Sequence, residues 1–392
     1  MSGTESNTII TAENEDIDLG VGDEQARWNT EALVNNVSSY YPGTCWGTRV
    51  FAAATGPGDV FYLTYFDLNH YALILVRVDH GKITAERVDP EGLHARSCGV
   101  SMDINPVTGT PAVSYRARDS TPIFAYKQNG IWTTEVVDPD ISEGHSTSLV
   151  YDRTGTPHLA YDDGSSFANL MYATRNPDGT WTREIADRGI GYHLGNAGKN
   201  PQLRITDSGV YIAHGDGFLY SSQRFTRKLT GENWTSVTVD RGWGETGTSS
   251  ITGLTGVFPT FTMGPNGIAT IIYEDALNQT LMMARGPLAN DSFKTSVLRS
   301  ADGIDMDGLY PALVSKDSTG LTGGHLVFTS SCNSALTYVD ISPDPAILPT
   351  RERVDVHAFT STVTSDSAGK PHIFYLDSMF ATFGRIKHAW LA

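Results

Sequence analysis

The stretch YDRTGTPHLAYDDGSSFANLMYATRNPDGTWTREIAD, residues 151–187, decides the fold because it repeats the pattern of residues 104–138, INPVTGTPAVSYRARDSTPIFAYKQNGIWTTEVVD. Each stretch contains a Gly turn, an apolar run, a second apolar run, another turn and an alternating run that begins near a Trp. Short apolar runs bounded by turn residues are typical of β-strands. Each stretch therefore predicts three strands, and the residues before its first turn predict one more.

The pattern recurs along the whole chain. Its second-strand segments, each of which opens with Gly, lie at residues 58–67, 109–119, 155–163, 209–216, 267–275, 323–331 and 369–377. Seven units of roughly 40 to 50 residues, with four short strands each, are typical of a β-propeller. The sequence therefore predicts an all-β, seven-bladed propeller with four antiparallel strands in each blade.

The two ends of the chain indicate how the ring closes. The last unit stops at RIKHAWLA (385–392) and lacks a fourth strand, whereas RWNTEALV (27–34) matches the fourth-strand pattern of TWTREIAD (180–187). An N-terminal strand that completes the last blade would leave no exposed sheet edge. We therefore expect one propeller domain over residues 27–392, after a disordered acidic tail over residues 1–26.

Trp residues recur at the start of the fourth strands, at Trp28, Trp132, Trp181 and Trp234. Repetition at equivalent positions predicts packing between blades rather than ligand stacking. Acidic residues recur after the second strands, and because a turn-capping Asp repeats with the fold we expect them to be structural. These acids are Asp67, Asp119, Asp163, Asp216, Asp275 and Asp377. Glu274 breaks this repetition and is the acid that we single out for a further role.

Two turns, NPDGTWT (176–182) and TGENWTS (230–236), resemble the Asp-box turns of the sialidase-like (BNR-type) propeller superfamily. The resemblance extends over almost the whole chain after residue 27, and it implies the fold. The family's box begins with Ser or Thr two places before the Asp, where this chain has Asn176. Sialidases also need three arginines, for which Arg49 is the one early candidate here. The resemblance therefore implies the fold rather than sialidase activity.

Charge and motifs limit the partners and cofactors. The formal net charge of −16 disfavours nucleic acid and anionic membranes as partners. No apolar run approaches the roughly 18 residues that a membrane span requires, and no signal peptide precedes the propeller. We therefore expect a cytoplasmic protein, or a secreted one if a leader has been removed. The sequence contains no P-loop, no dinucleotide-binding Gly motif and no zinc-binding motif, so we predict no cofactor and no metal.

The candidate site follows from the repeat, because the loops that enter the first strands meet at one mouth of a propeller channel. His145 and His357 occupy equivalent entry positions, and His is suited to acid/base work near neutral pH. Tyr310, Arg96 and Arg204 are predicted to orient a substrate oxygen. The predicted substrate-binding residues are Trp46, Tyr192, His193, Asn200, Trp243 and Phe258. Asn200, Phe258 and Tyr310 fill the same position in three successive blades.

Three classes of function fit this ring of residues. The first is a cofactor-independent enzyme that uses acid/base or template chemistry on a small molecule, such as a lyase, cyclase, isomerase or natural-product pericyclase (a Diels-Alderase, for example). The second is a sugar-binding lectin, and the third is a polysaccharide lyase or glycoside hydrolase. Long, aromatic entry loops favour the first class. The expected partner is a small-molecule or sugar ligand, and the oligomeric state is not predicted.

Overall fold

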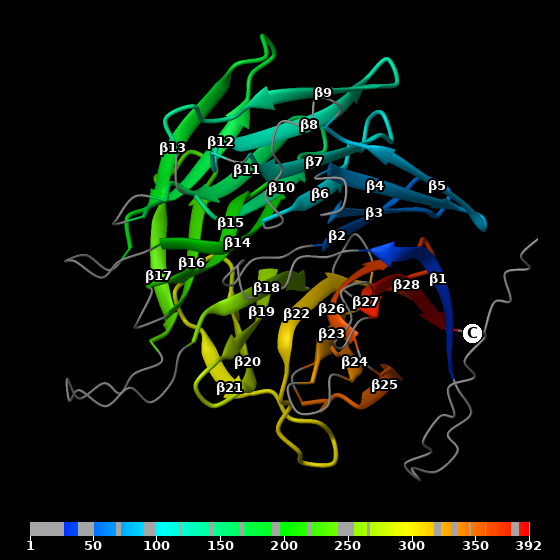
Figure 1. The fold of residues 1–392 in the computed structure, drawn as a ribbon. Helices are drawn as coiled ribbons and strands as arrows, with labels where there is room; N and C mark the ends of the chain where they lie inside the picture. The colour runs from blue at the N-terminus through cyan, green and yellow to red at the C-terminus, as the bar shows by residue number, and fades with distance from the viewer. Residues whose placement is uncertain are drawn as a thin grey trace, which may run out of the picture.

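A computed structural model describes residues 27–37, 51–67, 72–89, 99–117, 119–141, 144–164, 168–189, 197–217, 222–241, 255–264, 267–316, 323–330, 335–344, 346–356, 358–377 and 384–391. These residues form 28 β-strands in seven sheets of four strands each. The sheets radiate from a common centre as the blades of a propeller (Figure 1). The predicted fold class is therefore confirmed. None of the described segments contains a helix long and apolar enough to cross a membrane.

The first four blades follow one another along the chain. In each of them the first strand lies nearest the centre and the fourth strand lies at the outer edge (Figure 1). Blade 1 contains β2 (Phe51–Gly56), β3 (Val60–Asp67), β4 (Ala72–Asp79) and β5 (Lys82–Arg87). Blade 2 contains β6 (Ser101–Ile104), β7 (Pro111–Arg116), β8 (Pro122–Gln128) and β9 (Ile131–Val136). Blade 3 contains β10 (Thr147–Tyr151), β11 (Pro157–Asp162), β12 (Leu170–Arg175) and β13 (Trp181–Asp187). Blade 4 contains β14 (Ala197–Thr206), β15 (Gly209–Asp216), β16 (Ser222–Leu229) and β17 (Thr235–Asp240).

The remaining three blades complete the ring. Blade 5 contains β18 (Val257–Gly264), β19 (Ile268–Asp275), β20 (Thr280–Pro287) and β21 (Lys294–Val297). Blade 6 contains β22 (Leu309–Ser315), β23 (Gly324–Thr329), β24 (Leu336–Ile341) and β25 (Arg351–Asp355). Blade 7 contains β26 (Ala358–Ser365), β27 (Pro371–Asp377), β28 (Gly384–Leu391) and, from the other end of the chain, β1 (Trp28–Val37).

The N-terminal strand closes the ring as the sequence predicts. β1 pairs antiparallel with β28, from Trp28 opposite Leu391 to Val37 opposite Gly384. In Figure 1 the blue β1 lies beside the red β28, so the two ends of the described chain share one blade. This pairing gives blade 7 its fourth strand. The predicted tail, residues 1–26, lies outside the described residues.

The hydrophobic core consists of seven clusters, one at each interface between neighbouring blades. Consecutive residues of a second strand point to opposite faces of the blade, so they belong to two different clusters. In β7, Val113 packs against blade 1 and Ala112 against blade 3. Both faces of a second strand are thus buried, which explains why these strands read as continuous apolar runs. Burying one Val, Leu, Ile or Phe side chain in such a cluster stabilises the fold by about 1.5–3 kcal/mol.

Hydrogen bonds between blades reinforce this packing. An Asp at the end of a fourth strand accepts a hydrogen bond from an aromatic residue in the second strand of the next blade. In blades 2 and 3, Tyr161 donates to Asp138 at 2.8 Å, and in blades 4 and 5, Tyr273 donates to Asp240 at 2.7 Å. Three further interfaces have the equivalent pair: Tyr115 with Asp89, His214 with Asp187, and Tyr375 with Asp355. The recurring Val-Asp or Ala-Asp ending of the fourth strands is the sequence signal of this arrangement.

The repeated Trp residues pack between blades, which confirms the prediction. Trp181 meets Phe124 of blade 2 edge to face at 5.5 Å, and Trp234 meets Tyr172 of blade 3 at 5.2 Å. Trp28 meets Tyr338 of blade 6 in the same way. Edge-to-face contact at these distances is favourable beyond the area that it buries.

Candidate functional site

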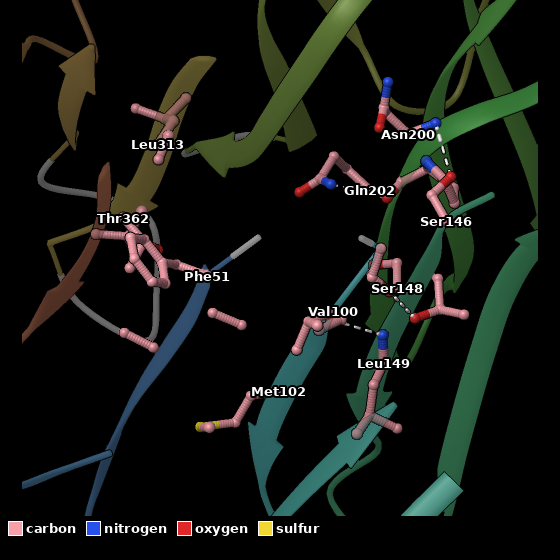
Figure 2. Close-up of a pocket in the computed structure, with 18 of the residues that line it drawn as sticks. Phe51, Val100, Met102, Ser146, Ser148, Leu149, Asn200, Gln202, Leu313 and Thr362 are labelled. Carbon is pink, nitrogen blue, oxygen red and sulfur yellow. Dashed lines mark hydrogen bonds between the residues drawn. The ribbon is translucent and has the colours of Figure 1, made fainter. Parts of the chain in front are cut away.

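The innermost strands surround a central channel. Residues of β2, β6, β10, β14, β22 and β26 line a cavity of about 140 Å³. Figure 2 shows these side chains, among them Ser148, Gln202 and Thr362, around the open centre. Pockets for drug-sized ligands usually measure about 300–1,000 Å³. The channel therefore holds at most a small group, and a larger ligand has to bind at the mouth, where the first strands begin.

Hydroxyl side chains of the channel wall tie the innermost strands together. Ser101 Oγ accepts from the backbone N–H of Leu149, and Ser146 Oγ accepts from that of Asn200 (Figure 2). Ser148 Oγ accepts from the N–H of Leu203 in the same way. Many of the polar groups of this wall are therefore engaged in structure.

At the mouth, three successive blades share one backbone feature. Asn200, Phe258 and Tyr310 each have a left-handed backbone, with φ of 49°, 48° and 56°, and each precedes a Pro. A shift of strand register accompanies each of them, as expected for a β-bulge. The structure thus confirms that these residues occupy equivalent positions. A left-handed backbone is unfavourable for bulky residues, and such positions concentrate at functional sites.

The first cluster of interest, which we call the charged cluster, contains His145, Asp162, Lys199 and Arg116. The Asp162 side chain is fully buried, whereas half of the His145 side chain is exposed. Asp162 Oδ2 lies 3.0 Å from His145 Nδ1 and 3.2 Å from Lys199 Nζ. Asp162 Oδ1 accepts from the backbone N–H of His145 at 2.9 Å. A buried carboxylate therefore orients a histidine whose other face is open to solvent.

The charge state of Asp162 follows from these contacts. Burial by itself would raise the pKa of Asp162, but the hydrogen bond from His145 and the charges of Lys199 and Arg116 hold that pKa well below its usual range. Arg116 is buried and donates from Nη2 to the Asp162 carbonyl at 2.6 Å. The carboxylate is thus ionised at neutral pH.

The second cluster, which we call the aromatic cluster, contains Phe258, Tyr310 and Phe359. Phe258 and Tyr310 meet edge to face with ring centroids 4.5 Å apart, and Phe359 lies 6.4 Å from Tyr310. Beside them lies Glu274, which is 4% exposed. Burial, followed by the charge of Asp275, raises the pKa of Glu274 to about 8. This carboxyl group is therefore mostly protonated at neutral pH.

The structure places the predicted site residues as follows. His145 and Asn200 lie close together, joined through Ser146, and Phe258 and Tyr310 are in contact. Arg204 lies farther along the channel wall, where its charge acts on Asp103 and its guanidinium lies over Phe261. Arg204 is therefore engaged with the channel wall. Six further predicted residues lie outside the described part of the chain: His357, Arg96, Trp46, Tyr192, His193 and Trp243.

Three of the acids after the second strands cap the segment that follows, whereas Asp377 pairs with Arg385 and Asp216 lies near Arg224. Asp119, Asp163 and Asp275 each accept a hydrogen bond from a backbone N–H in the turn that follows. The described residues hold no group of three or more acidic, His or Cys side chains that is suited to a metal ion.

Sequence reasoning missed Asp162 and Lys199. Asp162 follows Tyr161, at the position that directly succeeds the repeated aromatic residue of the second strand. That position differs from blade to blade, with Arg116 in blade 2 and Glu274 in blade 5. A residue that varies at a fixed position of a regular repeat is a signal of function. By this signal the sequence indicates Asp162 as well as Glu274, because each is an acid that directly precedes the repeated Asp.

No model of a known protein family matches the chain, and no curated protein matches it. Solved structures do resemble it. The GH93 α-L-arabinofuranosidase of Fusarium graminearum, in complex with arabinobiose, is 11% identical with a TM-score of 0.52, over 92% of this chain and 98% of that chain. The lectin BP39L of Burkholderia pseudomallei is 13% identical with a TM-score of 0.63, over 88% and 96%.

A third similar structure is the polysaccharide lyase Uly1, which is 11% identical with a TM-score of 0.53, over 92% of this chain and 90% of that chain. At such identities the likeness shows the fold alone. The chain is a seven-bladed propeller, and the solved structures that resemble its fold include a glycoside hydrolase, a lectin and a polysaccharide lyase.

Proposed function

We propose that the protein is an enzyme that performs acid/base chemistry, without a redox cofactor, on a small or sugar-like molecule at the mouth of the channel. The observation that carries this proposal is the contact between half-exposed His145 and fully buried Asp162. A histidine oriented by a buried carboxylate is the arrangement that general acid/base catalysis requires. The reaction class is that of a lyase, cyclase or isomerase.

The proposed chemistry depends on the two nitrogens of His145. When Nδ1 carries a proton, it donates to Asp162 Oδ2, and Nε2 presents a lone pair to the ligand. Nε2 then accepts a proton from the substrate, and the resulting imidazolium is stabilised by Asp162. The imidazolium can return this proton to another atom of the same molecule. Lys199 Nζ donates to the same carboxylate at 3.2 Å and lies 2.9 Å from His145 Nδ1, to which it can donate in the tautomer that carries its proton on Nε2.

The experiment first requires a ligand. Thermal unfolding of the protein would be measured with mono- and oligosaccharides and, separately, with apolar polyketide- or terpenoid-like compounds. A ligand at 100 times its Kd stabilises the folded state by about 2.7 kcal/mol, which is a readable shift. Any compound that stabilises the protein is then incubated with it and followed for conversion.

The decisive variant is His145→Gln. We expect kcat to fall by a factor of about 10²–10⁴, with little change in ligand binding, because the proton acceptor is lost. His80→Gln is the matched control, since His80 is exposed and lies on the turn between β4 and β5. Unchanged turnover in His145→Gln would contradict the proposal.

A sugar-binding protein without catalysis is the second candidate. Two observations favour it: the three similar structures described above are a lectin and two carbohydrate-active enzymes, and aromatic rings lie at the mouth. Aromatic side chains offer the apolar faces on which sugar rings pack. Stabilisation by a sugar that remains unconverted would support this candidate over the enzyme.

A further inference from the structure

Glu274 is a buried carboxyl group at the mouth, and no cation among the described residues pairs with it. Glu274 Oε2 is buried and has no hydrogen-bond partner among the described residues. The charge that acts on Glu274 is that of Asp275, which is also negative. An unpaired buried polar atom destabilises a folded protein, so its presence calls for an explanation.

The charged cluster shows what is missing. Lys199 stands directly before Asn200 in the bulge of β14, and there its ammonium contacts Asp162 of the preceding blade. Leu309 stands directly before Tyr310 in the equivalent bulge of β22. Blade 6 therefore presents a leucine to the preceding blade where blade 4 presents a cation.

Glu274 also has no counterpart of Arg116, the second cation that contacts Asp162. Asp162 also contacts Arg116, which occupies the position after the repeated aromatic residue in blade 2. The corresponding position in blade 4, the blade before Glu274, is Gly215. Glu274 therefore occupies the same position as Asp162, but both of the cations that neutralise Asp162 are absent.

The aromatic cluster occupies the neighbourhood of this carboxyl group. Val257, directly before Phe258, pairs with Glu274 across the first two strands of blade 5, and burial followed by the charge of Glu274 raises the pKa of Tyr310. Phe258 meets Tyr310 edge to face, and both residues adopt left-handed backbones that are unfavourable for bulky side chains. The bulges thus hold two rings at an angle beside the unpaired carboxyl group.

We propose that Glu274, Tyr310 and Phe258 form a second binding site, which takes an organic ammonium group. The ammonium would stand beside Glu274 where Lys199 Nζ stands beside Asp162. Ring faces attract cations, and the attraction is strongest when the cation is desolvated. The formal net charge of −16 also favours a cationic ligand. This site goes beyond the acid/base function of His145, because it requires no turnover.

The protonation of Glu274 supplies a signature. The free site holds a neutral carboxyl group at pH 6–7, flanked by Asp275 and by the Tyr310 phenol. A bound ammonium favours the carboxylate, so binding releases a proton. The affinity should therefore rise about tenfold per pH unit below pH 8, and level off above it.

The probes are choline and methylammonium, with 3,3-dimethylbutan-1-ol as the uncharged analogue of choline. Calorimetric titrations of the full chain at pH 6, 7 and 8, in two buffers of different ionisation enthalpy, measure affinity and proton release together. We expect at least one ammonium probe to bind more than tenfold tighter than the alcohol, with release of one proton. Equal affinity for choline and the alcohol, no pH dependence, or no binding of either cation would overturn the proposal.

Two variants test the assignment. Glu274→Gln should remove both the affinity and the proton release, whereas Glu232→Gln, which removes the same charge from an exposed turn, should change neither. Leu309→Lys should abolish binding by placing a tethered ammonium beside Glu274, and it tests the site even if Glu274→Gln does not fold. Retained binding in Leu309→Lys, with the fold intact, would contradict the assignment.

The same titration on His145→Gln separates the two proposals. Binding of an ammonium probe should survive this change, because His145 belongs to the charged cluster. Loss of turnover with retained binding would support both proposals, and loss of binding would overturn the independence of the second site.

Discussion

Asp162 and Glu274 occupy the same position in two blades, yet they differ in charge state. Each follows a tyrosine that donates to an Asp of the preceding blade, Tyr161 to Asp138 and Tyr273 to Asp240. The pKa of Asp162 is held well below its usual range, whereas that of Glu274 is raised to about 8.

This difference teaches that the repeat determines where a carboxyl group lies, and the residues of neighbouring blades determine whether it is charged. Lys199 and Arg116 supply two positive charges to Asp162, whereas Leu309 and Gly215 occupy the corresponding positions around Glu274.

The largest effect should come from Arg116→Met. This change leaves the buried Asp162 carboxylate without its buried partner, and breaking such a pair usually costs about 3–5 kcal/mol. Urea unfolding measures the loss. Arg153→Met, which breaks the exposed pair with Asp207, should cost under about 1 kcal/mol and serves as the control. A similar small loss in both variants would show that the charged cluster is not a stabilising unit.

Glu274→Gln should change the pH dependence of stability. Glu274 has a folded pKa of about 8, above its ordinary value of 4.5, so between these pH values the folded chain holds a proton that the unfolded chain has lost. Its contribution is therefore fully present below pH 4.5 and is lost as the pH rises through about 8, at about 1.4 kcal/mol per pH unit.

The Gln variant removes this slope, which urea unfolding at pH 5, 6, 7 and 8 would reveal against the parent chain. Glu232→Gln should leave the slope unchanged. Parallel pH profiles for the parent chain and Glu274→Gln would mean that the carboxyl group has a partner.

Tyr161→Phe and Tyr273→Phe should have effects of similar size, about 0.5–1.5 kcal/mol each, because each removes one hydrogen bond between neighbouring blades. Thermal or urea unfolding of both variants provides the measurement. The comparison of Asp162 with Glu274 rests on the equivalence of these two blades. If the losses of unfolding free energy in the two variants differ by more than about 2 kcal/mol, the two blades are not equivalent.

The smallest effect should come from Lys199→Leu, which gives blade 4 the residue that blade 6 has. We expect a loss of about 0.5–1 kcal/mol, because Lys199 is partly exposed and Arg116 continues to pair with Asp162. The loss should shrink in 1 M salt, since salt screens an exposed charge. A loss as large as that of Arg116→Met would place most of the counter-charge on Lys199.

Several elements of the fold were predictable from single residues. Gly at the start of the second strands and Trp at the start of the fourth strands recur with each blade, and the missing last strand reappears at residues 27–34. These patterns are local, and each reports one strand or turn. Because every second strand is apolar on both faces, seven copies of the pattern predict a closed ring in which each blade packs between two neighbours.

The site was predictable only in part. The equivalence of Asn200, Phe258 and Tyr310 could be predicted because all three belong to the repeat. The partnership of His145 with Asp162 and Lys199 could not, because it joins residues 17 and 37 positions from Asp162 across two blades. The sequence predicts that Arg204 orients a substrate oxygen. In the structure Arg204 lines the channel wall, where its charge acts on Asp103.

The sequence by itself determined the number of blades, the closure of the ring and the position of each carboxyl group along its strand, because these follow from local periodicity. Only the tertiary structure decided which carboxyl groups are charged. Charge depends on burial and on the cations of neighbouring blades, and these come together only when the ring closes. Asp162 and Glu274 therefore read as equivalent positions in the sequence and become different groups in the folded protein.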